Sequence, residues 1–256
     1  GGELKNTICL LKDGQAILSQ HLGDLEDART ADEFERTVAL YQDLFQHRPQ
    51  AVAVDLHPDY RSTRFGETLA ARHDLPLVGV QHHFAHIASV LADQGRPLDS
   101  GPVLGVALDG LGYGADGGIW GGEFLIADYL AAQRVGSFRP APMPGGTRAI
   151  LEPWRNTLAQ LLQLGDWQAF LAEHAELELT RFLQSKPLAT VMAMIDRGLN
   201  TPLSSSCGRL FDAVAAAAGL GRVVGLPVPG GPGDLDLPPV VAVVDELLAV
   251  PHEPSH

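Results

Sequence analysis

Short apolar runs alternate with longer amphipathic stretches along the first hundred residues of the chain. The runs have the length and the flanking turn residues of β-strands. We expect strands at residues 7–11, 16–21, 51–55 and 75–80. The amphipathic stretches predict helices at 30–45, 64–72 and 82–93, the first of them capped by Thr30 or Asp32. Because strands alternate with helices, the pattern predicts an α/β layer fold with a mainly parallel sheet.

The second half of the chain starts again with strands and continues with helices. We expect a meander of strands at 103–109, 119–128 and 134–138, then helices at 150–164, 166–174, 188–197 and 208–218. A proline- and glycine-rich segment follows at 227–239, and the apolar residues 240–250 predict one short helix. We therefore divide the chain into a first α/β lobe at 1–98, a second lobe at 99–220 and a divergent tail at 221–256. Because no strand is expected after residue 218, the second lobe is expected to be incomplete.

Composition narrows the class of protein. The chain has 256 residues and a formal net charge of −13, which argues against a general nucleic-acid surface because such a surface needs a basic face. Its two cysteines, Cys9 and Cys207, are too few for a disulfide framework or a cysteine zinc cluster. No apolar window reaches the roughly 18 residues of a membrane span, and the first residues lack a signal-peptide pattern. We therefore expect a cytoplasmic protein with no membrane or nucleic-acid partner, and a start without Met suggests a piece of a longer chain.

Two histidines four residues apart are the first candidates for chemistry. His82 and His86 follow the apolar run at 75–80 and fall on one face of the helix expected at 82–93. Imidazoles at this spacing can converge on one metal ion. His83 leaves the same helix about 100° away, so we do not expect it to bind the metal. Asp109 is expected to end a strand and to open the glycine-rich loop 110–114, whose N–H groups can hold a phosphate.

Seven motifs, in chain order, are similar to one family. They are Gly1-Gly2-Glu3-Leu4-Lys5-Asn6-Thr7, Asp55-Leu56-His57-Pro58-Asp59-Tyr60, Val80-Gln81-His82-His83, Asp109-Gly110 with Trp120-Gly121-Gly122-Glu123, Pro144-Gly145-Gly146, Glu152-Pro153-Trp154-Arg155 and Cys207-Gly208-Arg209-Leu210-Phe211-Asp212. These segments resemble HypF, the hydrogenase-maturation carbamoyltransferase, from residue 1 to about residue 220. The resemblance covers its carboxy-terminal transferase domain, which is related to tRNA threonylcarbamoyl transferases. It implies a two-lobed, actin-like α/β fold built of ribonuclease H-like repeats. The amino-terminal HypF domains (acylphosphatase, zinc-finger and carbamoyl-adenylate-forming) are missing, and they are expected as partners.

The resemblance also implies an activity. HypF-type proteins pass a carbamoyl group from carbamoyl-adenylate, which is made with ATP, to the C-terminal cysteine of a HypE-like acceptor protein. That thiocarbamate later becomes the cyanide ligand of nickel–iron hydrogenases. A divalent metal near the carbamoyl carbonyl or the phosphate can act as a Lewis acid. Ligation by nitrogen and oxygen does not distinguish iron from zinc.

Individual residues take roles from the same resemblance. His82 and His86 match the family's metal-binding histidines, and Asp109 matches the aspartate beside them. The nucleotide- and phosphate-binding residues implied by the family are Lys5, Asn6, Gly110, Gly112, Gly114 and Asp212. The family's late glycine-rich loop and its Asn-Asp-Gly-Gly segment, which supplies another metal-ligating aspartate, have no counterpart in the sequence.

Several assignments stay open from the sequence alone. His57 and Arg61 lie on a loop after a strand and either line the carbamoyl pocket or only brace Pro58. Cys207 can be interpreted as a nucleophile or as a small buried thiol at the N-terminus of a helix, and we favour the second interpretation. For the whole chain, one alternative is an antibiotic-type O-carbamoyltransferase. The other is not an enzyme but an inactive, truncated fragment that docks a partner.

Overall fold

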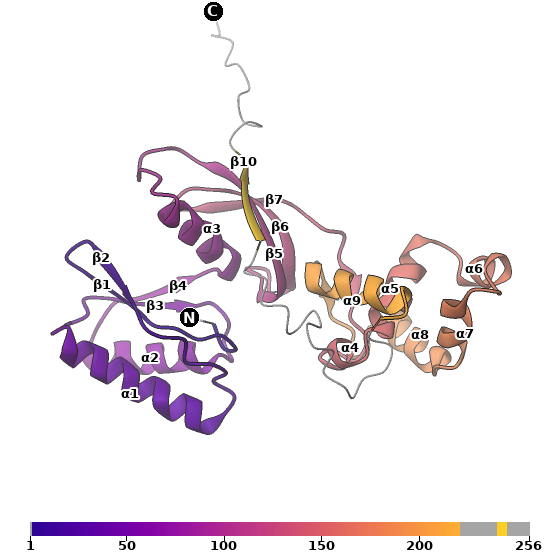
Figure 1. Ribbon diagram of the computed structural model, residues 1–256, viewed down its shortest axis with the longest axis horizontal. Helices are drawn as coiled ribbons and strands as arrows, with labels where there is room; N and C mark the ends of the chain where they lie inside the picture. The colour runs from indigo at the N-terminus through magenta and orange to yellow at the C-terminus, as the bar shows by residue number, and fades with distance from the viewer. Residues whose placement is uncertain (1, 221–239, 245–256) are drawn as a thin grey trace, which may run out of the picture. The chain divides into compact units, whose positions relative to one another are not determined.

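The computed structural model describes residues 2–220 and 240–244 (Figure 1). They form a mixed α/β structure that divides by its internal contacts into two units, Gly1–His82 and His83–His256. We describe each unit by itself. Among the described residues, none of the helices has both the length and the apolar character needed to traverse a bilayer.

The first unit opens with an antiparallel hairpin. Strands β1 (Cys9–Lys12) and β2 (Gln15–Leu18) pair with Lys12 opposite Gln15. The two turn residues between them, Asp13 and Gly14, both have positive φ angles, as the tight turns of hairpins require. The two strands expected at residues 7–11 and 16–21 are therefore confirmed, and they pair with each other.

Two helices and a parallel pair of strands make up the rest of this unit. Strands β3 (Val52–Asp55) and β4 (Leu77–Val80) are parallel, and helices α1 (Ala28–Leu44) and α2 (Arg61–His73) accompany them (Figure 1). Gly66 lets α2 lie against β3, because a Cβ atom there would overlap the Val54 side chain. The core of the unit is formed by Leu25, Phe34 and Val38.

The second unit is built on a sheet of six strands. Its order is β10-β5-β6-β9-β8, with β7 also pairing with β6. The strands are β5 (Val103–Tyr113), β6 (Ile119–Ala127), β7 (Ala132–Ser137), β8 (Ala141–Pro142), β9 (Leu203–Ser204) and β10 (Val240–Val244). The expected meander is confirmed, because β5, β6 and β7 pair antiparallel through short turns. The mainly parallel sheet expected for the first hundred residues is found only as the pair β3–β4, since β1–β2 is antiparallel. In the described residues the other parallel pairing is the bridge between β6 and β9.

Two expectations about this sheet are wrong. Asp109 does not end its strand: β5 continues to Tyr113, with a register shift against β6 between Leu108 and Gly112. The expected glycine loop is therefore a bulged strand, because two extra residues of β5 are accommodated inside the pair. In the tail, Val240–Val244 is not a helix but a strand antiparallel to β5. Four of its five residues are valine, whose branched Cβ favours extended backbone. Residues 245–250 of the expected helix lie outside the described part.

Helix α3 (His82–Asp93) packs on this sheet (Figure 1). Its side chains Ile87 and Leu91 form one core with Val103 and Leu125 of the strands. Gly105 permits the contact, since a Cβ there would overlap Ile87. The sequence led us to divide the chain at residue 98, whereas the contacts divide it after residue 82, because α3 buries its apolar face against β5 and β6.

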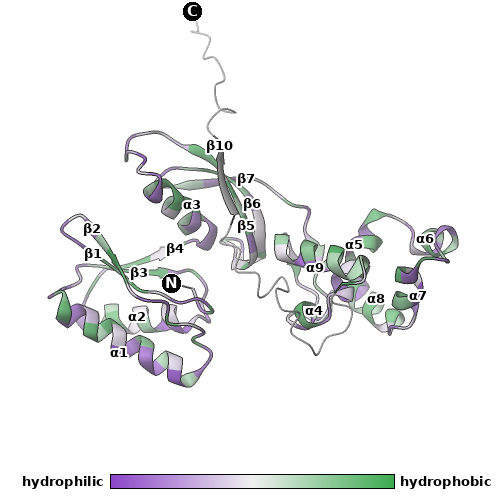
Figure 2. Cartoon of the chain, viewed as in Figure 1, coloured by the Kyte–Doolittle hydropathy of each residue, from purple (hydrophilic) through white to green (hydrophobic). Residues whose placement is uncertain are grey.

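A helical segment separates β8 from β9. It contains α4 (Arg148–Leu151), α5 (Trp154–Leu164), α6 (Trp167–Glu173), α7 (Glu178–Gln184) and α8 (Leu188–Arg197). Its core is formed by Trp154, Leu158, Trp167, Leu183 and Val191. The helices of this segment carry both hydrophobic and hydrophilic residues (Figure 2). The first six residues of α5, Trp154 to Ala159, are all buried, so this half of the helix is surrounded by protein on every side.

The helical segment returns to the sheet close to where it left. Strands β8 and β9 pair antiparallel, and the Met143 N–H group donates to the carbonyl of Pro202 at 2.9 Å. Helix α9 (Cys207–Ala217) then starts at the N-cap Ser206, whose hydroxyl accepts from the N–H group of Arg209. The position expected for Cys207, at the N-terminus of a helix, is therefore confirmed.

Candidate functional site

The candidate metal ligands lie on helix α3 and strand β5. His82 and His86 are one turn apart on α3, and Asp109 lies in the bulged part of β5. Each offers one ligand atom, and these atoms lie within 4.8 Å of one another. Nε2 of His86 is 3.9 Å from Oδ2 of Asp109. Two imidazoles and a carboxylate that converge in this way fit a divalent cation such as zinc or iron.

Asp55, at the end of β3, holds His82. Its Oδ2 accepts a hydrogen bond from Nδ1 of His82 at 2.6 Å, and its Oδ1 accepts from the N–H group of His57 at 2.8 Å. Burial raises the pKa of the Asp55 carboxyl, but the hydrogen bonds from His82 and His57 outweigh this effect and bring its pKa below its usual value. An ionised Asp55 fixes the His82 proton on Nδ1, so Nε2 is the nitrogen with which His82 can bind a metal. Ligating histidines are commonly oriented by a carboxylate in this way.

His83 has a different environment from its two neighbours. Its side chain is fully buried, and its ring lies beside that of Trp120 with 6.0 Å between centroids. Nε2 of His83 is 3.8 Å from Oδ2 of Asp109, but His83 does not belong to the converging group of ligand atoms. We therefore treat His83 as a core residue that packs behind Asp109.

The loop after β3 sets the tautomer of His57. The N–H group of Asp59 donates to Nδ1 of His57 at 3.1 Å. A backbone N–H can only donate, so Nδ1 carries a lone pair and the proton of the neutral ring is on Nε2. The ring stacks on Tyr60, with 4.1 Å between centroids and 3° between planes. His57 can therefore donate a hydrogen bond from Nε2, whereas His82 carries its proton on Nδ1.

The other candidate residues of the first unit differ in exposure and in hydrogen bonding. Arg61 is exposed at the first position of α2, where its N–H group donates to Oε2 of the buried Glu3 at 2.8 Å. Lys5 is exposed as well. Asn6 is fully buried, and its Nδ2 donates to the carbonyl of Gly2 at 2.7 Å. Asn6 therefore shapes the N-terminal segment from inside, whereas Lys5 lies at its surface.

The three glycines after Asp109 differ in what surrounds them. Gly110 and Gly112 lie in the irregular part of β5, and Gly114 begins the hairpin turn, where its N–H donates to the carbonyl of Gly118 at 2.9 Å. A Cβ on Gly114 would overlap Trp120, so the fold itself requires glycine at this position. A Cβ on Gly110 would meet no described atom within 4 Å, so the backbone at Gly110 borders open space that a ligand can approach.

The N-terminus of α9 lies against this bulge. The Ser206 hydroxyl donates to the carbonyl of Gly110, and a Cβ on Gly208 would come within 3.0 Å of the Gly110 Cα. The contact is supported by Glu123, which is fully buried on β6. Its carboxylate accepts hydrogen bonds from the Gly121 N–H at 3.1 Å, from the Ser205 hydroxyl and from Nε of Arg134 at 2.6 Å. One carboxylate therefore joins β6, β7 and the start of α9.

Two titratable groups of α9 are buried. Asp212 accepts a hydrogen bond at Oδ2 from Nε of Arg209 at 2.6 Å. Burial raises the pKa of Asp212, and the Arg209 charge opposes this effect without cancelling it. Burial also raises the pKa of the Cys207 thiol, which is 5% exposed. A thiol with a raised pKa is a weak nucleophile near neutral pH, which agrees with a structural role for Cys207.

Comparison with known proteins identifies the family. A model described as the HypF Kae1-like domain matches residues 1–93, and one described as the second subdomain of the carbamoyltransferase Kae1-like domain matches residues 105–225. The chain belongs to the HypF family. It is 48% identical over 220 residues to the carbamoyltransferase HypF of Rhodobacter capsulatus. It is 33% identical over 224 residues to the probable carbamoyltransferase HypF of Methanocaldococcus jannaschii.

These HypF relatives are much longer than the chain. Each of the two alignments covers 86% of the chain, but only 29% of the first relative and 28% of the second. Two solved HypF structures also match. A full-length HypF in a phosphate- and nucleotide-bound form superposes with a TM-score of 0.76 at 34% identity, over 91% of the chain and 29% of that protein. HypF of T. kodakarensis superposes with a TM-score of 0.72 at 30% identity, over 85% of the chain and 29% of that protein.

Sequence reasoning missed two carboxylates of this region as contributors to the site. Asp55 and Glu123 each stood inside a quoted motif, but neither was given a role. A carboxylate at the end of a buried strand, followed by a loop with histidine, was the available signal for Asp55. No local pattern predicts Glu123, because its partner Ser205 is 82 residues away.

Proposed function

We propose that this chain is the part of a HypF-type protein that transfers the carbamoyl group of carbamoyl-adenylate to the C-terminal cysteine of a HypE-like acceptor. The observation that carries the proposal is the convergence of His82, His86 and Asp109, with His82 oriented by Asp55, in a chain of the HypF family. In the reaction the cysteine loses its proton to water, and its sulfur attacks the carbamoyl carbon. The bond from that carbon to the phosphate oxygen breaks, and adenosine monophosphate leaves. No oxidant or reductant is needed.

His82, His86 and Asp109 would hold a divalent ion, iron or zinc. When bound, such an ion supplies Lewis-acid polarisation of an oxygen beside the reacting carbon. Asp55 keeps the proton of His82 on Nδ1. His57 is the proposed donor to the carbamoyl oxygen, because its Nε2 carries the proton in the tautomer that the Asp59 N–H selects. Arg61, exposed at the start of α2, is the second candidate for a substrate contact.

The nucleotide would use both glycine backbone and charged side chains. Gly110 and Gly112 are the proposed phosphate contacts: the backbone at Gly110 borders open space, and its N–H group, which donates to Oδ1 of Asp109 at 2.6 Å, would turn to a phosphate oxygen. Lys5, which is exposed, would add a positive charge. Gly114 and Asn6 support these segments from inside. Asp212 is the proposed acceptor for the ribose hydroxyls through Oδ1, since Oδ2 is engaged by Arg209. A full-length HypF that superposes on this chain was solved in a phosphate- and nucleotide-bound form, which supports a nucleotide as the ligand class.

We further propose that the two units are the lobes of an actin-like fold. In the first unit strands β1 and β2 precede helix α1, and in the second unit strands β5, β6 and β7 precede helices α4 to α9, an order that supports two repeated halves. The proposal does not depend on the sequence boundary near residue 98.

The test is a transfer assay on the chain loaded with zinc or ferrous iron. Carbamoyl-adenylate and a peptide ending in the C-terminal cysteine of HypE are added, and mass spectrometry follows the thiocarbamate. We expect transfer to this peptide, none to a peptide with serine in place of the cysteine, and loss of transfer in His86→Ala. His73→Ala, which changes an exposed histidine of α2, is the matched control.

Two other results would contradict the proposal. Transfer only to a sugar hydroxyl would assign the chain to the antibiotic-type O-carbamoyltransferases. Binding of the peptide without transfer would assign it to partner docking.

A further inference from the structure

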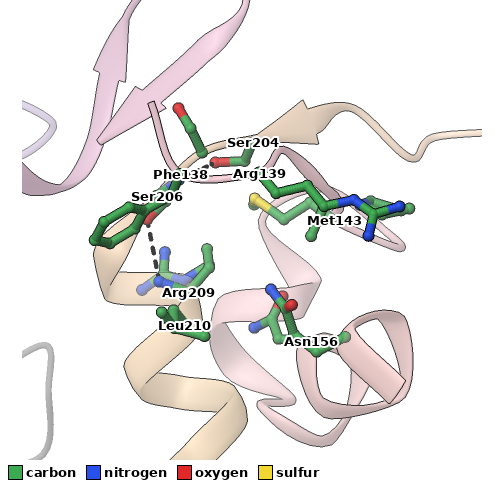
Figure 3. A pocket seen from close by; sticks show the side chains of 12 residues that line it. Phe138, Arg139, Met143, Asn156, Ser204, Ser206, Arg209 and Leu210 are labelled. Atoms are coloured by element: carbon green, nitrogen blue, oxygen red, sulfur yellow. Dashed lines mark hydrogen bonds between the residues drawn. The ribbon is translucent and has the colours of Figure 1, made fainter. Parts of the chain in front are cut away.

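A cavity of about 240 Å³ lies in the second unit beside the N-terminus of α9 (Figure 3). Its wall comes from the segment after β7, from α5 and from the residues that join β9 to α9. His82, His86 and Asp109 are not among the residues that line it. Its size is below the roughly 300–1,000 Å³ of pockets for drug-sized molecules, so a small ligand fits it.

The charge of the cavity wall is opposite to the charge of the chain. Arg139 and Arg209 both line the cavity, and its lining includes no aspartate or glutamate. The chain as a whole carries a formal net charge of −13. A local positive wall on an acidic protein selects anions, because the remaining surface repels them.

Arg209 is held in place for such a role. Its side chain is only 12% exposed, and its Nε donates to Oδ2 of Asp212 at 2.6 Å. In the described part of the chain, the terminal N–H groups of its guanidinium have no other hydrogen-bond partner. They are not among the buried side-chain atoms that lack a partner, so they border solvent-accessible space. The cavity is therefore the place where these donors can meet an acceptor.

The rest of the wall combines hydroxyl groups with an apolar surface. Ser204 and Ser206 come from the segment before α9 (Figure 3). Met143 and Leu210 contribute the apolar part. Arg139 is exposed and has no ion pair within the described residues, so its charge is available to a ligand. A ligand that satisfies all these groups has an anionic head and an apolar body.

We propose that this cavity binds a small organic anion, a carboxylate or a phosphate monoester, with its charged group held by Arg209 and Arg139 and its apolar part against Met143 and Leu210. The proposal does not rest on carbamoyl transfer. A chain without transfer activity would still be expected to bind the anion.

The experiment uses the full chain, with phenyl phosphate, benzoate and inorganic phosphate as probes. Nuclear magnetic resonance titration follows the backbone of Ser204 and Ser206 and the methyl group of Met143. We expect saturable shifts at these residues, with both aromatic anions binding more tightly than inorganic phosphate. Arg139→Gln should weaken binding on the order of tenfold, as loss of one charge-assisted hydrogen bond does. Arg197→Gln, an exposed arginine at the end of α8, is the control and should bind as the unchanged protein does.

Arg209→Gln is a second variant, with thermal denaturation measured beside it because Asp212 loses its ion pair. In the folded variant we expect binding to fall further than in Arg139→Gln. Equal affinity of Arg139→Gln and Arg197→Gln, or shifts that do not saturate at Ser204, Ser206 and Met143, would overturn the proposal. Equal binding of phenyl phosphate and inorganic phosphate would overturn the assignment of the apolar part.

Discussion

Nδ1 of His82 donates to Oδ2 of Asp55 at 2.6 Å, although the two residues are 27 positions apart in the sequence. The bond joins the first residue of α3 to the last residue of β3. It gives His82 a defined tautomer before any metal arrives. Because the His82 ring is already oriented, it need not turn when a metal ion binds.

Removal of the Asp55 carboxylate should weaken metal binding. We expect Asp55→Ala to lower zinc affinity by about 10- to 100-fold and Asp55→Asn to lower it less, since an amide oxygen still accepts the Nδ1–H bond. Titration calorimetry measures the affinities, and nitrogen chemical shifts of His82 report its tautomer. Asp59→Ala, at an exposed position of the same loop, is the control. Unchanged affinity in Asp55→Ala would show that Asp55 does not orient a ligand.

Substitutions of the three neighbouring histidines should affect metal binding and stability differently. His82→Ala and His86→Ala should abolish zinc binding, and Asp109→Asn should reduce it. His83→Ala should leave the affinity of the folded protein unchanged but lower its free energy of unfolding by about 2–4 kcal/mol, because it removes a fully buried ring. Calorimetry and urea denaturation on the same samples test both parts. If His83→Ala loses metal as fully as His86→Ala, the assignment of ligands is wrong.

Acid should remove the contribution that the ionised Asp55 side chain makes to the free energy of unfolding. The pKa of Asp55 is lowered in the folded protein, so its ionised form stabilises the fold at pH values above its ordinary pKa of 3.8. This contribution is lost as the pH falls through the lowered pKa. The difference in unfolding free energy between the unchanged protein and Asp55→Asn should therefore be constant from about pH 7 to 5 and should shrink below about pH 4. Urea denaturation with a chelator present measures it, and a difference that stays constant to pH 2 would contradict the assignment.

The two cysteines should react at different rates. Cys9 is exposed, whereas Cys207 is buried and its pKa is raised by that burial. Iodoacetamide should therefore label Cys9 in the native protein and both residues after unfolding. Cys207→Ala should keep its carbamoyl-transfer activity. Loss of transfer in a folded Cys207→Ala protein would make this thiol part of the chemistry.

Two glycines that face each other should respond in opposite ways to alanine. A Cβ on Gly110 meets open space, so Gly110→Ala should change the unfolding free energy by less than about 0.5 kcal/mol while it hinders phosphate binding. A Cβ on Gly208 would press on the Gly110 backbone, so Gly208→Ala should lose about 1–2 kcal/mol, despite its better helix propensity. Urea denaturation and titration with adenosine monophosphate measure both effects. Equal stability losses in the two variants would contradict this description of the bulge.

Periodicity predicted the local elements well where the signal was local. The helix at residues 82–93 and the three-strand meander follow from apolar spacing and turn residues alone. The N-cap of α1 was missed, because Asp27 accepts from the N–H groups of Arg29 and Thr30 and so starts the helix before Thr30. Helix α7 was missed as well. It is seven residues long, which is too short for a clear helical period.

The candidate site could be predicted only in part. The spacing of His82 and His86 places two ligands on one helix face, and the family resemblance named Asp109 as the third. The structure brings one ligand atom of each within 4.8 Å of the others. The roles of Asp55 and Glu123 depend on partners far away in the sequence, which a local pattern cannot supply. Residues 240–244 show the same limit, since their apolar run fits a helix or a strand until the partner strand β5 is known.

The closeness of β8 and β9 makes the helices between them an insertion that starts and ends at one place on the sheet. The chain leaves the sheet at Pro142 and comes back at Leu203, and these two residues are partners in one ladder. Closing so short a gap with a tight turn would cost little chain entropy. The segment is nevertheless tied to α9, because the Thr157 hydroxyl of α5 donates to the carbonyl of Ala213 at 2.8 Å. A hairpin in place of residues 144–201 would therefore keep the sheet connected but would uncover one side of the helix whose N-cap, Ser206, holds the Gly110 carbonyl.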